Sequence, residues 1–475
     1  MRRLKVAILA LLPDSGHVVP LLKVGAMLVA RGHEVICLLP DECSAVAETY
    51  GLANTRIGPA LSPIAAEARR GFGARTIFTA SLDVYYRDYH AAIFARSADM
   101  VESILNELKP RPPDLILVDN HQFPDVFAGI GAELGVPIVF HDSAGGLHNR
   151  TGSFSVMVYG KQMPRWRELC ILAAGSIYNV YREAARIYRF RRCGLPRAMA
   201  RARTDLCTLL TKLPPRDGAR APTSARVSST ASGRMKYYFA TGLGLLEHRQ
   251  RHLALPPDRR VFGAILDVHR APLPPDLKQW LDSQPQHSVV FVSFGSMVTL
   301  SAHRLRTLLS AFGSLDAPVL WAITGGKDAL SPLPLPKMIR VEPFVPQSSV
   351  LLHPAVGACV THGGIGTVLE CMAAGVPMVV LPVMWDQPYN AQFVDDLAAG
   401  IRRDWWRLSD RVLVQALRSV LLSPKYRCRV SSIAAELRAE KGSEEVLAFL
   451  EAIAQASDTE SWTPDSGRLR HDGAD

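Results

Sequence analysis

The chain has 475 residues, of which 48% are hydrophobic and 21% charged, a composition that excludes a disordered protein and favours a well-folded globular one. This length predicts two domains of ordinary size. The formal net charge of +10 allows anionic partners, but the basic residues are dispersed and no zinc-finger or RNA-binding motif is present, so we expect no nucleic-acid partner.

The eight cysteines are scattered and form no C-x-x-C pair, which argues against a zinc ribbon or a redox dithiol and favours a reducing compartment, the cytoplasm. No run approaches the ~18 apolar residues of a membrane span. The apolar run 6–12 follows basic residues, as in a signal peptide, but it is short and lacks a small-residue cleavage site. We expect no signal peptide and no C-terminal membrane anchor, and a disordered tail over 458–475.

The first half of the chain alternates strand-like and helix-like apolar patterns. Strands are expected at 5–12, 33–39, 114–118, 136–140 and 237–241, and helices at 18–31, 62–70, 81–108 and 123–134. Strand-helix-strand units of this length form parallel sheets, which predicts a doubly wound first domain. No G-x-G-x-x-G follows the first strand, which argues against a dinucleotide dehydrogenase.

The middle of the chain has a different composition. Residues 165–203 are helical in pattern and rich in arginine, which indicates either a solvated helix face or weak peripheral contact with an anionic membrane. Residues 213–233 predict a mobile loop, and the proline-rich segment 247–282 predicts a linker that leads into the second domain.

The second half repeats the strand-helix alternation. Strands are expected at 288–294, 319–323, 357–361 and 376–383, helices at 305–312 and 367–374, and three amphipathic helices at 409–422, 425–439 and 443–456. The fold class is therefore α/β, with two facing Rossmann-like, doubly wound parallel-sheet domains. A ligand in such sheets lies at the carboxyl ends of the strands, so we place the site in the cleft between the domains.

A dense run of polar, aromatic and glycine residues lies between 341 and 399. The turn His362-Gly363-Gly364 joins a strand to a helix, and such a turn exposes N–H groups that could bind a diphosphate. Glu370 lies one helical turn on, where its carboxylate could accept hydrogen bonds from ribose hydroxyls. Phe344 offers an aromatic face for a base and Gln347 an amide for the edge of that base.

The next strand is followed by Asp386 and Gln387, which could hold sugar hydroxyls or merely cap the following helix. The order and spacing of all these residues resemble the donor-sugar signature of the family 1 UDP-glycosyltransferases, over roughly 289–399. The resemblance implies a UDP-sugar site made by Ser296, Phe344, Val345, Gln347, His362, Gly363, Gly364, Gly366, Thr367, Glu370, Asp386 and Gln387.

Two positions depart from the family pattern. Phe344 stands where plant and animal members usually carry Trp, and Gly366 stands where they usually carry Asn. The form Gly-Gly-x-Gly-Thr is more similar to the soluble, macrolide-type bacterial members.

The family's two-domain architecture, called GT-B, implies how the chain divides. We expect an acceptor-binding domain at 1–245, a linker at 246–285 and a UDP-sugar-binding domain at 286–440. A helix at 441–457 would pack back on the first domain, ahead of the tail at 458–475.

A candidate catalytic pair lies in the first domain. His17, in Gly16-His17-Val18-Val19-Pro20, follows the first strand, and Asp119 ends the strand at 114–118. A histidine can take the proton of an attacking hydroxyl, and a carboxylate on its second nitrogen fixes the tautomer. Taken alone, His17 could be an ordinary turn residue and Asp119 a helix cap; the resemblance favours the base and its partner, with Asp125 as the runner-up.

These residues predict an inverting glycosyltransferase that moves a hexose, glucose by default, from a UDP-sugar to a hydroxyl of a small apolar acceptor. No Asp-x-Asp element is present, so we expect no metal and no other cofactor. The alternatives are a UDP-sugar epimerase or hydrolase on the same scaffold, and a non-catalytic UDP-sugar- or lipid-binding module. The oligomeric state and the acceptor are not predicted.

Overall fold

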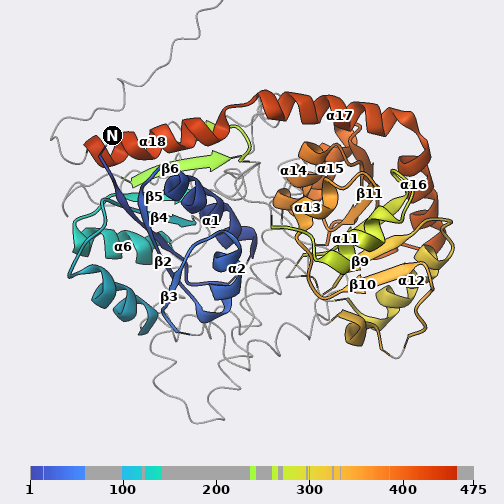
Figure 1. The fold of residues 1–475 in the computed structure, drawn as a ribbon, viewed down its shortest axis with the longest axis horizontal. Helices are drawn as coiled ribbons and strands as arrows, with labels where there is room; N and C mark the ends of the chain where they lie inside the picture. Colours follow the sequence, from blue (N-terminus) through green and yellow to red (C-terminus); the bar gives the residue numbers. More distant parts are fainter. Residues whose placement is uncertain are drawn as a thin grey trace, which may run out of the picture.

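The computed structural model of the protein describes residues 2–13, 15–58, 99–119, 124–141, 236–241, 259–265, 271–295, 298, 300–323, 326–331, 333–383 and 386–456. Within these ranges the chain forms two α/β domains that lie side by side (Figure 1). Each domain is built on a parallel sheet, as the sequence predicts.

The first domain is built on a seven-stranded sheet of order β3-β2-β1-β4-β5-β6-β7. The strands are β1 Lys5–Leu9, β2 Glu34–Leu39, β3 Asn54–Arg56, β4 Leu115–Asp119, β5 Ile138–His141, β6 Lys236–Thr241 and β7 Arg259–Phe262. Its helices are α1 Ser15–Ala30, α2 Ser44–Thr49 and α6 Pro124–Leu134, with a further helical segment at 99–108 and a short 3-10 turn, η1, at Asp41–Cys43.

The second domain is built on a six-stranded sheet of order β10-β9-β8-β11-β12-β13. The strands are β8 Val289–Ser293, β9 Val319–Ala322, β10 Ile339–Glu342, β11 Val356–Thr361, β12 Met378–Val380 and β13 Gly400–Arg402. Its helices are α11 Pro275–Asp282, α12 Ala302–Gly313, α13 Gln347–Leu351, α14 Ile365–Ala374, α15 Gln387–Asp396, α16 Asp410–Leu422 and α17 Pro424–Ala439, with 3-10 turns η5 Gly326–Leu330 and η6 Trp405–Arg407. The last helix of the chain, α18 Gly442–Ala456, returns to the first domain.

Both sheets are covered on both faces, which explains why their central strands are continuous apolar runs. In β1, Val6 and Ile8 face one core cluster, whereas Ala7 and Leu9 face another on the opposite side of the sheet. Every residue of β4, β8 and β11 is buried.

Each sheet has one topological switch point, the place where the chain stops adding strands on one side of the first strand and begins to add them on the other. In the first sheet the chain runs outward from β1 to β3 and then returns to add β4 on the other side of β1. In the second sheet it does the same from β8 to β10 and then adds β11 beside β8. Loops that leave the carboxyl ends of such strand pairs diverge and open a ligand crevice between them.

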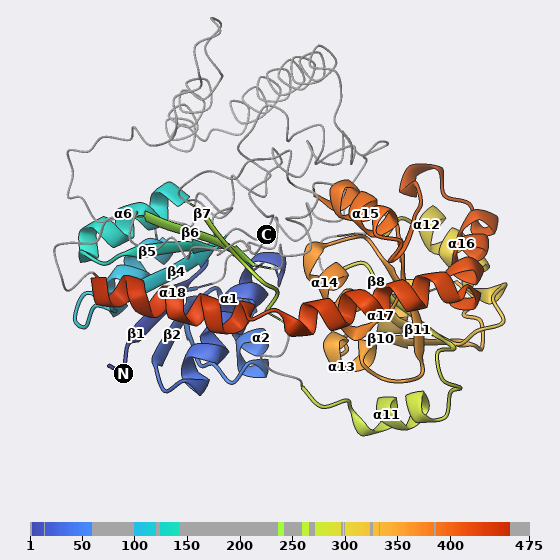
Figure 2. The same ribbon diagram turned by 90° about the horizontal axis from the view of Figure 1, so that it is seen from above.

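The C-terminal helices span both domains: α17 lies on the second domain and α18 on the first (Figure 2). Val446, Leu447 and Leu450 of α18 belong to the apolar core of the first sheet. The Glu451 carboxylate lies 3.0 Å from His33 Nε2, and His33 Nδ1 accepts the Leu4 N–H, so Nε2 carries the proton that it donates to Glu451.

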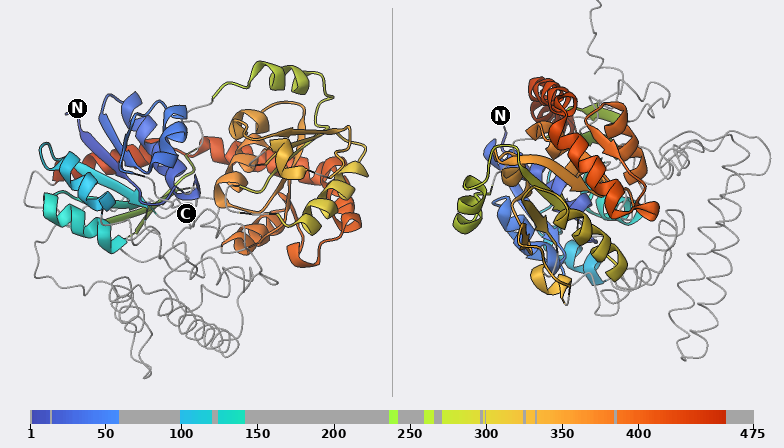
Figure 3. Two further views of the ribbon diagram at one scale, coloured as in Figure 1. Left: turned by 90° about the horizontal axis from the view of Figure 1, so that it is seen from below. Right: turned by 90° about the vertical axis from the view of Figure 1, so that its right-hand side faces the viewer.

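The first domain extends further along the chain than residue 245. The strand β7 pairs with β6, so the first sheet reaches Phe262, and 237–241 is not its last strand. The segment expected to be a linker therefore contains a strand of the first sheet and, in the part next to the second domain, the helix α11. The two views of Figure 3 show α11 on the outside of the second domain.

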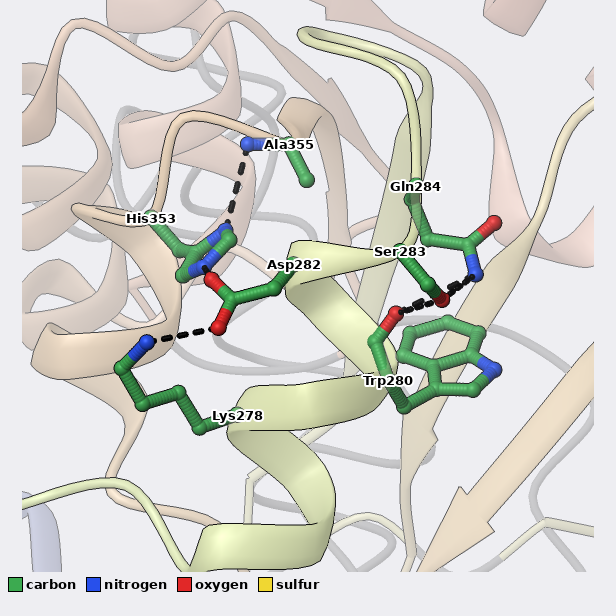
Figure 4. Close-up of polar contacts among 7 residues, drawn as sticks. All are labelled: Lys278, Trp280, Asp282, Ser283, Gln284, His353 and Ala355. Carbon is green, nitrogen blue, oxygen red and sulfur yellow. Dashed lines mark hydrogen bonds and ion pairs between the residues drawn. The ribbon is translucent and has the colours of Figure 1, made fainter.

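His353, which lies within residues 341–399, makes hydrogen bonds that support the fold (Figure 4). Its Nδ1 accepts the Ala355 N–H at 3.2 Å, so its Nε2 carries the proton that it donates to Asp282 Oδ1 at 3.0 Å. Lys278 lies 2.6 Å from the other oxygen of Asp282, and these two partners hold the pKa of that carboxyl below its usual range. Through these two hydrogen bonds, His353 links the end of α11 to the loop before β11.

Several predicted segments lie outside the described residues: 62–70, 81–98, 165–203, 213–233 and the tail. Across the part of the chain that the structure describes, no helix is both long and apolar enough to cross a membrane.

Candidate active site

The first-domain half of the site is a histidine paired with a carboxylate. His17 Nδ1 lies 3.0 Å from Asp119 Oδ1. Asp119 ends β4 and is fully buried, whereas the His17 side chain keeps 25% of its surface exposed. Because β1 and β4 flank the switch point, the residues that follow β1 and end β4 meet at one place in the crevice.

The local structure around His17 differs from the predicted turn. Helix α1 begins at Ser15, so Gly16 and His17 lie in its first turn and Pro20 lies inside the helix. A Cβ added at Gly16 would meet nothing within 4 Å, so no close approach requires glycine there. His17 is therefore positioned by the start of a helix.

A second histidine lies beside the pair and was missed by the sequence analysis. His141 is the register partner of Asp119 in the adjacent strand β5, and its Nδ1 lies 3.9 Å from Asp119 Oδ2. That separation is an electrostatic contact, too long for a hydrogen bond. His141 ends its strand as Asp119 does, which is the signal that would have identified it.

The second-domain half of the site lies at the β8/β11 switch point. His362 follows β11, and its ring edge fits between two glycines. A Cβ at Gly295 or at Gly364 would come within 2.8 Å of that imidazole, and Gly295 also has a φ of +67°. The two glycines are therefore required by the packing of this one ring.

His362 is uncharged at neutral pH in this arrangement. Part of its surface still reaches solvent, yet burial of the ring lowers the pKa of His362 to about 4, while a hydrogen bond to the Ser293 backbone opposes that shift. A neutral imidazole has one N–H, and that proton is given to Ser293. His362 accordingly links the end of β11 to β8 through this hydrogen bond.

The helix α14 begins directly after this turn. Gly363, at φ +89°, redirects the chain, and Gly364 is the N-cap with no side chain to satisfy the first-turn N–H groups. Gly366 and Thr367 lie in that first turn. A helix start of this kind presents several N–H donors and the positive end of the helix dipole, which suits an anion.

Glu370 lies further along α14 and is bonded on both oxygens. Gln347 donates to Oε2 at 2.7 Å and also contacts Thr367 Oγ1 at 3.2 Å. Lys23, on α1 of the first domain, lies 3.1 Å from Oε1. The structure thus brings together Gln347, Thr367 and Glu370 and adds a lysine from the other domain.

Phe344 and Val345 follow β10 but point to different environments. Phe344 is 71% exposed, so its ring is open to stack on a planar ligand, whereas Val345 is buried in the core. Only the backbone of Val345 could contact a ligand.

Asp386 and Gln387 begin α15. Asp386 is the N-cap residue but makes no side-chain cap bond; instead its Oδ2 accepts from Asn390 Nδ2 at 2.7 Å. Asn390 also donates to Gly363 O at 2.8 Å, which ties Asp386 to the glycine turn. Gln387 is buried and its Oε1 accepts the Val383 N–H, so it supports the loop before α15. Asn390 was not among the predicted site residues.

Two predicted or alternative residues remain to be placed. Ser296 is not among the described residues, and neither is His121, two positions after Asp119. Asp125 lies in α6 at a position whose side chain is not described.

Residues 253–437 match the family model described as UDP-glucoronosyl and UDP-glucosyl transferase. This part of the chain is similar to that family. The matched residues contain β8 to β13 and α14, so every described second-domain site residue lies within the match.

The similarity to curated family proteins is confined to part of the chain. UDP-glucuronosyltransferase 2B14 of Oryctolagus cuniculus is 34% identical over 178 residues, which cover 37% of this chain and 33% of that protein. The 2-hydroxyacylsphingosine 1-beta-galactosyltransferase of Rattus norvegicus is 33% identical over 178 residues, 37% of this chain and 32% of that protein. The chain spans about a third of the length of these relatives.

Two solved structures share the two-domain fold over nearly the whole chain. Os79 from O. sativa, solved with U2F and trichothecene, superimposes with a TM-score of 0.65 at 18% identity, covering 94% of this chain and 100% of that one. The glycotransferase of kitacinnamycin gives a TM-score of 0.61 at 21% identity, covering 95% and 100%. The predicted GT-B architecture is confirmed by these likenesses.

Gly366, in the first turn of α14, has no steric need to be glycine. A Cβ there would meet nothing within 4 Å. We expect Gly366→Ala to keep or raise the thermal midpoint, because alanine lowers the conformational entropy of the unfolded chain and so stabilises the folded protein by about 0.4–1 kcal/mol. Gly363→Ala is the matched control and should destabilise, because φ is +89° and its Cβ would lie 2.7 Å from Val380. A lower thermal midpoint in Gly366→Ala than in the original protein would show that the glycine is needed for the fold.

Proposed function

We propose that the protein transfers a hexose from a UDP-sugar to a hydroxyl of a small, lipophilic acceptor, with inversion at the anomeric carbon. One observation carries the proposal. His17 and Lys23 lie on the same helix, and Lys23 contacts Glu370, so the helix that holds the candidate base lies directly against the candidate donor site. Figures 1 and 2 agree that α1 faces α13 and α14.

The proton chemistry follows from the hydrogen bond to Asp119. If His17 donates its Nδ1 proton to Asp119, Nε2 is the nitrogen left to accept a proton. An acceptor hydroxyl placed against Nε2 loses its proton as its oxygen attacks the anomeric carbon from the face opposite the diphosphate. The buried carboxylate then stabilises the imidazolium that forms.

The donor is held by the second domain. The diphosphate lies against the first-turn N–H groups of α14, which also stabilise the negative charge that develops as UDP leaves. The ribose hydroxyls bond Glu370, the base stacks on the exposed Phe344, and the sugar lies toward Asp386. Glucose is the default sugar in this proposal.

Release of UDP measured with and without a phenolic or sterol acceptor tests the function. Release only in the presence of acceptor supports transfer. Release without acceptor supports a hydrolase, and an altered sugar without release supports an epimerase. Binding of UDP-sugar without any turnover supports the non-catalytic module.

We further propose that turnover needs no divalent metal. The sequence has no Asp-x-Asp element, and in the described residues no three His, Cys, Asp or Glu side chains gather where they could bind a metal ion. Treatment with EDTA is expected to leave the rate unchanged. Turnover abolished by EDTA and restored by Mn²⁺ or Mg²⁺ would refute this.

A reducing compartment, the cytoplasm, remains our proposal for location. The cysteines within the described ranges, Cys37, Cys43, Cys359, Cys371 and Cys428, are all free thiols. The thiols of Cys359 and Cys371 contact one another as a hydrogen-bonded pair, and burial raises the pKa of Cys371.

A further inference from the structure

The contact between Lys23 and Glu370 joins the two domains at the donor site. Lys23 Nζ lies 3.1 Å from Glu370 Oε1, although the residues are 347 positions apart. Both side chains are largely removed from solvent, with 15% and 18% of their surfaces exposed. Salt screens a largely buried ion pair much less than a surface ion pair. This contact therefore holds the Lys23 and Glu370 side chains in position more strongly than a surface pair would.

The Glu370 carboxylate still has acceptor capacity when both partners are bonded. Gln347 Nε2 occupies one site on Oε2 and Lys23 one site on Oε1. An ionised carboxylate offers about four acceptor sites, so two ribose hydroxyls can bond without displacing either partner. Among the described residues, Tyr50 and Cys371 also interact with this pair. Burial raises the pKa of Tyr50, Lys23 opposes that shift, and Glu370 adds to it. Burial likewise raises the pKa of Cys371, and Glu370 adds to that shift.

From this geometry we propose that Lys23 is a positioning residue of the donor site. Its ammonium fixes the orientation of Glu370 for the ribose hydroxyls, so the affinity for the nucleotide depends on a residue of the opposite domain. The inference rests on the proposed function only in that the site binds a uridine nucleotide. It assigns to α1 a part in donor binding, in addition to carrying the candidate base.

Calorimetric titration with UDP tests the assignment. Lys23→Met keeps the length of the side chain and removes the charge, and we expect it to weaken UDP binding about 10-fold. Lys23→Arg, which keeps a cation, should stay within about threefold of the original affinity. Lys278→Met is the matched control, because Lys278 pairs with Asp282 at the surface, and it should leave UDP binding unchanged.

A nucleotide without ribose hydroxyls shows whether the effect passes through Glu370. With 2′,3′-dideoxyuridine diphosphate, the original protein and Lys23→Met should bind equally well. In a Glu370→Gln background, Lys23→Met should add little further loss of UDP affinity. Lys23→Gln provides a second uncharged variant if Lys23→Met fails to fold.

The outcomes separate this inference from the proposed function. Normal UDP affinity in a folded Lys23→Met, or an equal loss for UDP and its dideoxy analogue, would overturn the role of Lys23 and leave the transferase proposal standing. Failure of the original protein to bind UDP at all would instead overturn the proposed function.

Discussion

Replacement of His17 by alanine is expected to lower the rate of sugar transfer by roughly 10²–10⁴-fold, the usual contribution of a general base. The physical reason is that Nε2 of His17 is the atom proposed to accept the hydroxyl proton, whereas the buried Asp119 carboxylate lies against Nδ1. UDP affinity should be nearly unchanged, because the donor is held mainly by the second domain. Acceptor-dependent UDP release gives the rate, and calorimetry gives the affinity.

The same prediction extends to the partner of His17. Asp119→Asn keeps the side-chain volume but should also lower the rate, because an amide N–H toward Nδ1 favours the wrong tautomer. The double variant should be little slower than His17→Ala alone, since the two residues act as a unit. His303→Ala removes an exposed histidine from α12 and should keep full activity.

Near-normal turnover in His17→Ala with an alcohol acceptor would contradict the base assignment. Asp125 and His121 would then be the next candidates. His141 would need the same test, because it lies 3.9 Å from Asp119 at the end of the adjacent strand.

Replacement of Glu370 by alanine is expected to weaken UDP binding by about 10- to 100-fold, which corresponds to the 1.5–3 kcal/mol typical of hydrogen bonds to a charged group. The variant also removes the carboxylate that bonds Lys23 and Gln347, so part of the loss reflects reorganisation of the site. Titration calorimetry with UDP measures the affinity, and a thermal melt reports the accompanying change in stability.

A glutamate outside the site provides the comparison. Glu436→Ala removes a surface ion pair with Arg429 on α17 and should change neither UDP affinity nor stability appreciably. If Glu370→Ala bound UDP as tightly as the original protein, Glu370 would be a contact between domains and not a ligand of the ribose.

The sequence was sufficient to predict the residues at the switch points. The apolar strand 114–118 and the first strand are continuous and buried, so their ends could be located, and residues at those ends meet once the sheet is parallel. The turn after β11 could be located for the same reason, because His362-Gly363-Gly364 stands between a buried strand and a periodic helix.

The parts that could not be predicted depend on contacts between distant segments. The strand β7 has four residues, two of them arginines, at the edge of the sheet beside proline-rich sequence, so no apolar period marks it. Lys23 is one of many dispersed lysines and arginines, and only the packing of α1 against the second domain brings it to Glu370. Likewise, the lowered pKa of His362 follows from burial of its ring against Gly295, which lies in a distant segment, so no local pattern encodes it.

Inverting transfer to the acceptor is tested most directly by measuring the anomeric configuration of the product. We would incubate the protein with UDP-glucose, in which the sugar is α-linked, and a phenolic acceptor, and determine the anomeric configuration by the proton coupling constant in NMR. Direct attack assisted by His17 predicts a β-glycoside, and a His17→Ala sample should contain far less of it. An α-glycoside, or free glucose in place of a glycoside, would contradict inverting transfer to the acceptor.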